Sequence, residues 1–313
     1  MIRFSNGQTA MFFAASGSMG FDGRGWLWER WMPKRWLDPS LFWVATKTLA
    51  LSRRKGNSRF RWLSWLNVRP LFRNGTLVGW VNALGMPGPG FGPWLLEEGR
   101  SFAQMNGVVS LASVEGDIQT RAINLALMML AVCGAMKNLA ALEVNVSCPN
   151  TENGKLPTAE EVVYLLREIK ESASRSSLKK SHPIIVKLSV AQDYCEIARR
   201  LEKDRLAEAI SINSVPWKRV FPARTSPFAK FGGGGVSGKI AQEHTWEMVQ
   251  KLSEASSIPV IAPSIWNYED IDHAMQLGAQ AVSFGSVFMA TPWWPTQAVR
   301  RWNEEQRMLK KAN

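Results

Sequence analysis

Apolar residues along this chain form short runs that alternate with longer stretches of helical periodicity. The short runs are near-continuous in Val, Ile, Ala and Phe, which is typical of strands buried on both faces. Eight such strands are predicted, at Ala10–Ser16, Phe42–Thr48, Val108–Ser113, Leu142–Cys148, Pro183–Ser189, Ala207–Ser214, Pro259–Ser264 and Ala281–Ser286. Helices are predicted in the gaps, at Thr120–Lys137, Ala159–Glu171, Gln192–Lys203, Gln242–Ala255, Tyr268–Leu277 and Thr296–Lys310.

This order of elements predicts an α/β fold, a (β/α)8 TIM barrel that occupies residues 1–313 as a single domain with insertions at the C-terminal face of the strands. A doubly wound open sheet is the alternative, but no Gly-rich phosphate turn follows the first strand. Residues 53–82 are predicted to form an excursion after the second strand. Residues 215–238 follow the sixth strand, and a connection of this length in a compact domain is usually an active-site loop.

Composition narrows the class of protein. A hydrophobic fraction of 46% is ample for a core, and no stretch approaches the roughly 18 uninterrupted apolar residues of a membrane span. The short apolar run near the N-terminus is interpreted as the first strand rather than a signal peptide. The three cysteines are widely spaced and odd in number, and no metal-ligand spacing is present. We therefore expect a cytoplasmic protein without a metal site.

The net charge of +12 permits an anionic partner or only a solvated basic surface. The solvated surface is favoured, and no nucleic acid is expected, because no nucleic-acid motif accompanies the charge. Nine of the fifteen tryptophans precede residue 95, and residues 24–37 and 53–70 mix them with Arg and Lys. These insertions suit a membrane surface or an electron-transfer partner. The favoured interpretation is that the tryptophans pack between loops while the cations stay in water.

Candidate chemistry gathers at the predicted strand ends. Leu142–Thr151 (LEVNVSCPNT) begins as an alternating strand and breaks into a turn that carries Cys148 and Asn150. In a barrel enzyme that end of a strand bears the active site, although Cys148 could instead be an inert buried thiol. Lys187 lies inside an apolar strand, where its ammonium group needs an anionic partner. The alternative role for Lys187 is a structural pair with a buried carboxylate.

Motifs in the expected order carry a resemblance that covers residues 10–290. Ala15–Gly20 (ASGSMG), TKT at 46–48 followed by Gly56–Asn57, NALGMPGPG at 82–90 and NVSCPNT resemble motifs of the dihydroorotate dehydrogenase family. The later VKLS, INS, GGVSGK, PVIAPSI and VSFGS segments also match in order. Ordered matches at successive strands are more specific than any single motif. Cysteine in the base loop resembles class 1 of the family, since class 2 members have serine and an N-terminal helical extension that we do not expect here.

The resemblance implies an FMN-dependent enzyme that oxidises dihydroorotate to orotate in pyrimidine biosynthesis. Cys148 would be the base that removes the C5 proton, while hydride leaves C6 for flavin N5. Lys187 would stabilise the reduced flavin. Residues implied to bind substrate are Lys47, Asn82, Asn145, Asn150, Asn213 and Ser214. Residues implied to bind the cofactor are Ser16, Lys47, Thr48, Ser110, Asn145, Lys187, Gly238, Ser264, Gly285 and Ser286.

The chain departs from the family pattern at three places. The seventh-strand loop reads APSI, in which Pro263 has no N–H to donate to phosphate and Ser264 replaces a glycine. Ser110 stands where the family has asparagine near the flavin, and Ser286 replaces a threonine. Two alternative functions follow, a flavin enzyme for another dihydropyrimidine such as dihydrouracil, and a diverged barrel without turnover that acts as a binding or membrane-surface protein.

The partners left open are a homodimer, an electron-transfer subunit and a membrane surface. Fumarate, or NAD through an iron–sulfur partner subunit, remains open as the electron acceptor, because this chain has no cysteine cluster of its own. Quinone is disfavoured, although the Trp-rich insertions could create a route for it.

Overall fold

Eight parallel strands close into a barrel in the computed structural model, which describes residues 1–26, 28–58, 65–136, 139–147, 155–176 and 182–312. The strands are consecutive along the chain and around the barrel, so the predicted TIM barrel is confirmed. Each observed strand lies within or beside a predicted one. They are β3 (Phe12–Ala14), β4 (Trp43–Ala45), β7 (Gly107–Leu111), β8 (Ala141–Asn145), β9 (Ile184–Leu188), β10 (Ala209–Ile212), β13 (Val260–Ala262) and β14 (Ala281–Phe284).

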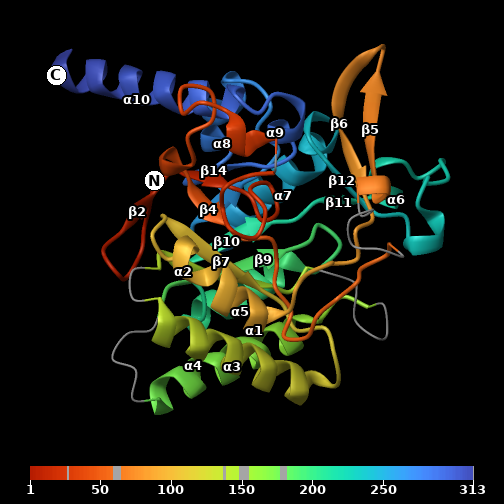
Figure 1. The fold of residues 1–313 in the computed structure, drawn as a ribbon, viewed down its shortest axis with the longest axis vertical. Coiled ribbons are helices and arrows are strands. Elements are labelled where there is room, and N and C mark those ends of the chain that lie inside the picture. Colours follow the sequence, from red (N-terminus) through yellow and green to blue (C-terminus); the bar gives the residue numbers. More distant parts are fainter. Residues whose placement is uncertain (27, 59–64, 137–138, 148–154, 177–181, 313) are drawn as a thin grey trace.

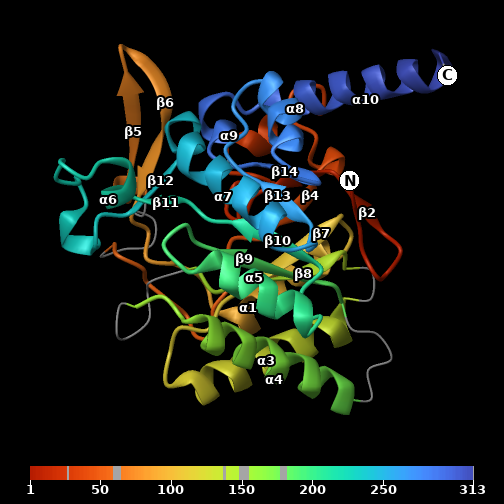
Figure 2. The same cartoon turned by 180° about the vertical axis from the view of Figure 1, so that it is seen from behind.

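Helices surround the barrel, and all six predicted ones are present (Figures 1 and 2). They are α3 (Ile118–Ala135), α4 (Ala159–Arg175), α5 (Tyr194–Lys203), α7 (Gln242–Ala255), α8 (Glu269–Gln276) and α10 (Trp294–Ala312). Shorter helices are α1 (Phe91–Glu97), α2 (Gly99–Phe102), α6 (Trp217–Val220) and α9 (Val287–Ala290). Local sequence fixes several starts. At α4, for example, Thr158 and Glu161 form a reciprocal capping box.

The barrel interior is apolar at the N-terminal ends of its strands. Its buried side chains include Phe13, Ala45 and Ile185, from three different strands. The hairpin of β1 (Ile2–Arg3) and β2 (Thr9–Ala10) belongs to the same cluster and closes that end. A larger core fills the space between the strands and the helices. Because the end at the strand N-termini is closed, the barrel can take a ligand only at the C-terminal ends of its strands.

A four-stranded antiparallel sheet beside the barrel was not predicted. It contains β5 (Val68–Arg73), β6 (Thr76–Asn82), β11 (Val215–Pro216) and β12 (Gly235–Ser237), in the order β11-β12-β6-β5. It joins the excursion after the second barrel strand to the loop after the sixth (Figure 1). Asn74 and Gly75 form the tip of the β5–β6 hairpin at φ values of 50° and 75°. An Asn-Gly pair between apolar runs is a strong hairpin signal that the sequence analysis missed.

The Trp-rich insertions are only partly packed, so the favoured interpretation of them is wrong for several residues. Trp94 is fully buried, but Trp28, Trp31, Trp36 and Trp65 are exposed.

The short 3-10 helix η1 (Glu29–Trp31) begins at a turn that Glu29 closes by accepting the Trp26 N–H at 2.7 Å. The other carboxylate oxygen of Glu29 is buried and has no hydrogen-bond partner. Burial raises the pKa of Glu29 to about 7.

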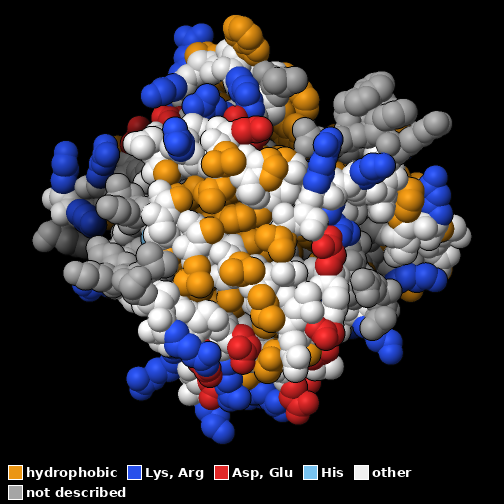
Figure 3. All heavy atoms as spheres, turned by 60° about the horizontal axis from the view of Figure 1, so that its bottom comes forward, with side chains coloured by type: hydrophobic (Ala, Val, Ile, Leu, Met, Phe, Trp, Pro, Cys, Tyr) orange, Lys and Arg blue, Asp and Glu red, His pale blue; other side chains and the backbone are white. Residues whose placement is uncertain are grey.

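The outer face of α3 is apolar as well. Ile123 and Leu127 are exposed there, and Leu96 is exposed on α1. Figure 3, turned to bring this end forward, shows an apolar band across the middle of the face with charged side chains toward its edges. By length and composition α3 could cross a membrane, with a mean hydropathy of 1.4, yet it packs against α4 and β7 as a barrel helix does.

The raised pKa of Glu29 predicts that the protein becomes less stable as pH rises. The folded state holds the Glu29 proton up to about pH 7, whereas the unfolded chain releases it near pH 4.5. The contribution is therefore complete below pH 4.5 and is lost as pH approaches 7, by up to about 3 kcal/mol. Urea unfolding at several pH values should show this decline in the wild type but not in Glu29→Gln. An identical decline in Glu29→Gln would contradict the assignment, and Glu304→Gln, on exposed α10, serves as control.

Candidate active site

A buried ion pair lies inside the barrel above its apolar floor. The Lys187 Nζ atom is 3.3 Å from Glu143 Oε1, and the two residues are 7% and 4% exposed. Ser110 donates to Glu143 Oε1 at 2.7 Å, and Ser211 donates to Glu143 Oε2 at 2.9 Å. Strand register makes this possible, because Ser110 lies beside Glu143 and Ser211 beside Lys187. Glu143, to which the sequence analysis gave no role, is thus the centre of the polar layer, and Lys187 has the buried partner that its alternative interpretation expected.

A chain of hydroxyl groups continues from this pair across the barrel. The Ser110 Oγ atom is 3.0 Å from Thr48 Oγ1, which is 3.1 Å from Ser16 Oγ. Asn145 donates to the same Thr48 oxygen at 3.1 Å. Five residues predicted to bind the cofactor or to act in catalysis are therefore connected through the polar layer. They are Ser16, Thr48, Ser110, Asn145 and Lys187.

A cavity of about 20 Å³ lies at the same level. Its polar lining includes Ser16, Glu143, Lys187, Ser211 and Ser283. The volume is enough for about one water molecule. The ion pair thus has space beside it, and a solvent molecule there would find several donors and acceptors.

The predicted base loop follows β8. Cys148 and Asn150 lie outside the described residues, but the chain on both sides of them is described. The Gln192 side-chain amide donates to the Val146 and Pro157 carbonyls, at 3.2 Å each. Asn145 Oδ1 accepts from the Ser147 N–H at 3.1 Å. Gln192, which the sequence analysis did not single out, holds together the two ends of the segment that carries Cys148.

Lys47 follows β4 and contacts the loop after β3. Its N–H donates to the Gly20 carbonyl at 2.8 Å, and its Nζ atom lies 5.2 Å from the centre of the Phe21 ring. The insertion that begins there also reaches α1, since Trp94 donates its indole N–H to the Phe21 carbonyl at 3.0 Å. Lys47 is therefore positioned by the first insertion as well as by its own strand.

The predicted substrate loop, residues 82–90, is fixed at its start by the second insertion. Asn57 donates its side-chain amide to the Ala83 carbonyl at 3.0 Å. Asn82, at the end of β6, donates to the Gly235 carbonyl at 3.4 Å. Asn213 follows β10, and its side-chain oxygen accepts the Ser214 N–H at 2.8 Å. Asn82 is thus bound to β12, which pairs with β11 directly after Ser214.

The residues predicted to hold the cofactor phosphate come from three loops. Ser264 has a φ of 66°, the left-handed region that favours glycine, and its carbonyl accepts from Gln242 at 2.9 Å. Gly238 has a φ of 96°, and a Cβ there would lie 2.6 Å from the Gly79 Cα and 2.9 Å from the Trp266 ring. Ser264 thus has a backbone conformation that favours glycine, and Gly238 lies where only glycine fits against its neighbours.

The last two predicted site residues follow β14, whereas the two described cysteines lie outside the barrel. Gly285 and Ser286 follow β14, where the Ala15 N–H joins β3 to the Phe284 carbonyl at 2.8 Å. Cys133 and Cys195 lie on the outer helices α3 and α5, where burial raises the pKa of each thiol. Both thiols are therefore poor nucleophiles. Among the residues that the structure describes, no group of three or more His, Cys, Asp or Glu could hold a metal ion.

Comparison with known proteins now decides the family. A family model described as dihydroorotate dehydrogenase matches residues 12–305, nearly the whole chain. The chain belongs to the dihydroorotate dehydrogenase family. The site residues named above lie within the matched range.

Similar proteins carry the same family name. Three of them are named dihydroorotate dehydrogenase B (NAD(+)), catalytic subunit. The one from Malacoplasma penetrans is 28% identical over 70% of this chain and 69% of its own length. Those from Halalkalibacterium halodurans and Caldicellulosiruptor saccharolyticus are also 28% identical, over 72% and 89% of this chain and 74% and 84% of their own.

A solved structure shares the fold. The dihydroorotate dehydrogenase of Eimeria tenella, crystallised with ferulenol, superposes with a TM-score of 0.70. It is 16% identical, and the match covers 96% of this chain and 82% of that one. The barrel is therefore the architecture of a solved dihydroorotate dehydrogenase.

The buried pair predicts a specific pattern of unfolding energies. Glu143→Gln should lower the free energy of unfolding by about 3 kcal/mol, because it leaves the Lys187 ammonium buried without its carboxylate. Lys187→Met should cost a similar amount. The double variant should recover part of the loss, because neither charge then remains unpaired. Urea unfolding of the FMN-free protein measures all three.

The control for this cycle is the exposed pair of Glu247 and Lys251 on α7. Glu247→Gln should change the unfolding midpoint little, because exposed ion pairs contribute little. Strictly additive losses for Glu143→Gln and Lys187→Met would show that the two side chains are not coupled.

Proposed function

We propose that this protein oxidises dihydroorotate to orotate in pyrimidine biosynthesis, with FMN as its bound cofactor. The observation that supports this most is the polar layer of Lys187, Glu143, Ser110 and Asn145. It lies at the strand ends directly before the Cys148 loop. Family membership supports the reaction class, and this layer offers a buried cation and the Asn145 amide at the strand ends where we propose that substrate and cofactor bind.

Cys148 is the proposed base that removes the C5 proton of the substrate. Asn145 and Gln192 fix the start of its loop, so the thiolate can be held against one face of the pyrimidine ring. Asn82, Asn150, Asn213 and Ser214 are proposed to bind the ring and its carboxylate, since side-chain amides offer both donors and acceptors. Lys47 is proposed to place a positive charge between substrate and cofactor.

FMN, when bound, would accept the hydride that leaves the substrate. Lys187 is proposed to stabilise negative charge at the cofactor ring, and its attachment to Glu143 and Ser211 limits where the ammonium group can point. Ser16, Thr48 and Ser110 are proposed to line the ring site, and Gly238, Ser264, Gly285 and Ser286 to hold the phosphate. Pro263 cannot take part as a donor.

The proposed partners follow from the relatives and from the surface. Several similar proteins are named as catalytic subunits of an NAD(+)-linked enzyme, so we propose that a separate electron-transfer subunit carries electrons from this chain. Fumarate is the alternative acceptor. We propose a cytoplasmic location for the reaction.

We also propose that two copies of the chain associate as a homodimer through α3. Ile123 and Leu127 are exposed on α3, and the view of this end of the molecule shows an apolar band with charged side chains toward its edges, as protein interfaces have (Figure 3).

An absorbance spectrum followed by anaerobic dihydroorotate tests the proposed reaction. The purified protein should show flavin bands that bleach on addition of dihydroorotate. Cys148→Ala should keep its flavin and bleach roughly 10²–10⁴-fold more slowly, because the base is gone. Cys195→Ala, which removes a thiol on α5, should bleach like the wild type.

Each contrary outcome has its own meaning. Normal bleaching of Cys148→Ala would remove Cys148 as the base. Bleaching by dihydrouracil but not by dihydroorotate would support another dihydropyrimidine as substrate. A protein that binds no flavin after incubation with FMN would support the diverged barrel without turnover.

Light scattering of the eluting protein tests the homodimer. The wild type should show the mass of two chains. Leu127→Asp should show the mass of one, because it places a charge at the centre of the proposed contact. Met308→Asp, at another exposed apolar position, on α10, should remain dimeric. A wild type with the mass of one chain would contradict the proposal.

A further inference from the structure

The positive charge of this protein is concentrated in its first 96 residues. They contain 13 of the 38 Lys and Arg residues but only three of the 26 Asp and Glu residues. Between positions 39 and 96 there is no acidic residue at all. The remaining 217 residues are nearly balanced, with 25 basic and 23 acidic residues. One segment of the fold therefore carries almost all of the net charge.

The three acids of this segment are too few to balance its thirteen cations. Asp22 pairs with Arg30 at 2.6 Å, and Asp38 pairs with Arg300 of α10 at 3.2 Å. Glu29 is buried, and its raised pKa keeps it largely protonated below about pH 7. The exposed cations of the segment include Arg24, Lys34, Arg35, Arg53, Lys55, Arg69 and Arg73.

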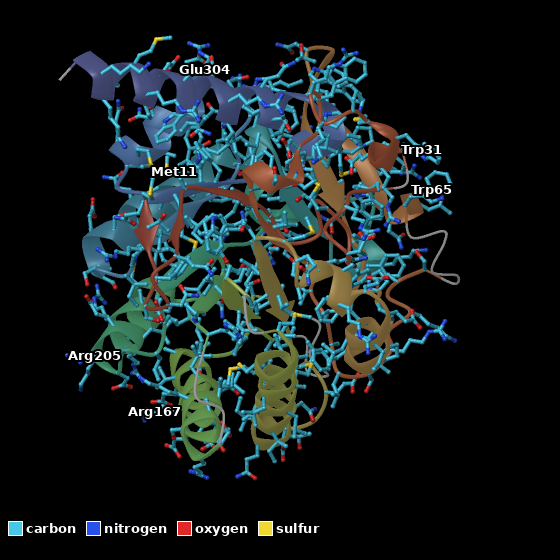
Figure 4. The ribbon with its side chains drawn as sticks, turned by 60° about the vertical axis from the view of Figure 1, so that its left-hand side comes forward. Met11, Trp31, Trp65, Arg167, Arg205 and Glu304 are labelled. Carbon is cyan, nitrogen blue, oxygen red and sulfur yellow. The ribbon has the colours of Figure 1, made fainter. Side chains whose placement is uncertain are left out.

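Large aromatic side chains protrude among these cations. Trp31 is 89% exposed, Trp65 64% and Trp28 60%. Trp31 and Trp65 belong to different insertions, yet they project on the same side of the molecule (Figure 4). Arg167, Arg205 and Glu304 lie on other sides of the same view. Leaving apolar side chains of this size in water is unfavourable, so a partner that covers them would gain apolar burial.

The insertions leave the C-terminal ends of β3 and β4, which is the end of the barrel that bears the candidate active site. The backbone of the first insertion is anchored to α10. Arg300 donates to the Lys34 and Arg35 carbonyls at 3.0 and 3.1 Å, and Arg35 lies over the Trp36 ring at 5.5 Å. The exposed Trp36, five positions after Trp31, therefore lies on a segment whose backbone is held by α10.

We propose that this face docks the protein on an anionic lipid bilayer, with Trp28, Trp31 and Trp65 at the headgroup level and the surrounding Arg and Lys on the lipid phosphates. Tryptophan prefers the membrane interface, because its ring is apolar and its N–H is polar. Each Lys or Arg near an anionic surface adds to the electrostatic attraction. Weak apolar insertion and a basic cluster together give the two signals that stable peripheral binding needs.

The surface fits lipid better than a protein partner. A protein interface has a contiguous apolar centre and a polar rim, as the face of α3 does. Here Trp31 and Trp65 come from two separate insertions, and the segment that carries them has thirteen Lys and Arg residues but only three acids, so its charge is predominantly positive. A fluid layer of anionic headgroups can surround each ring and each cation independently.

Vesicle co-sedimentation tests the proposal without any measurement of turnover, so its outcome is independent of the proposed reaction. The wild type should sediment with vesicles of phosphatidylcholine that contain phosphatidylglycerol, and not with phosphatidylcholine alone. Trp31→Ser combined with Trp65→Ser should weaken binding about tenfold or more. Arg53→Gln combined with Lys55→Gln should weaken it and reduce its dependence on salt.

Matched controls remove the same groups elsewhere. Met308→Ser with Leu309→Ser removes exposed apolar area from α10, and Arg167→Gln with Arg205→Gln removes two exposed cations from the α4 and α5 region. Both should bind like the wild type. A blue shift of tryptophan emission on vesicle binding should occur in these controls and be reduced in the Trp31/Trp65 variant.

Three results would overturn the proposal. They are no binding to phosphatidylglycerol vesicles at low salt, binding that the tryptophan variant retains in full, and equal loss in the controls. Soluble polyaspartate or single-stranded DNA that binds as tightly, with the same dependence on Trp31 and Trp65, would assign the face to an acidic protein or a nucleic acid instead.

Discussion

The buried ion pair of Glu143 and Lys187 is the constraint on which the candidate active site depends. A lysine inside a barrel is tolerated only if an anion accompanies it, and that anion in turn requires its remaining lone pairs to be satisfied. Ser110 on β7 and Ser211 on β10 meet this need, from the two strands that flank β8 and β9, which carry the pair. Because the pair is coupled to Thr48, Ser16 and Asn145 through hydroxyl contacts, one electrostatic requirement sets the orientation of a whole layer of side chains.

The departures from the family pattern acquire a physical meaning in this layer. Serine at position 110 is short enough to donate directly to Glu143, so it joins Thr48 to the ion pair. Serine at position 264 keeps a left-handed backbone, at a conformational cost on the order of 1 kcal/mol for a residue with a Cβ. The backbone at this position thus has a conformation that glycine adopts more readily than serine.

The two loops that follow β3 and β4 have two roles in the molecule. On the side of the barrel they contact Lys47 and the start of the predicted substrate loop, and on the solvent side they carry basic and aromatic side chains. Binding at the outer surface and the position of active-site residues are therefore borne by the same segments. The unpredicted sheet has a similar dual role, since it ties the loop after β10 to the strand that ends in Asn82.

The sequence by itself determined the barrel, because eight apolar runs separated by amphipathic helices have few other ways to be buried. It also determined the family, because motifs recurred in order at the strand ends. Only the tertiary structure decided that Glu143 is the partner of Lys187, since these residues are 44 positions apart and meet through strand register. It likewise decided that Gln192 spans the base loop and that several tryptophans face outward. Such contacts depend on distances between segments, and a one-dimensional pattern holds no record of those distances.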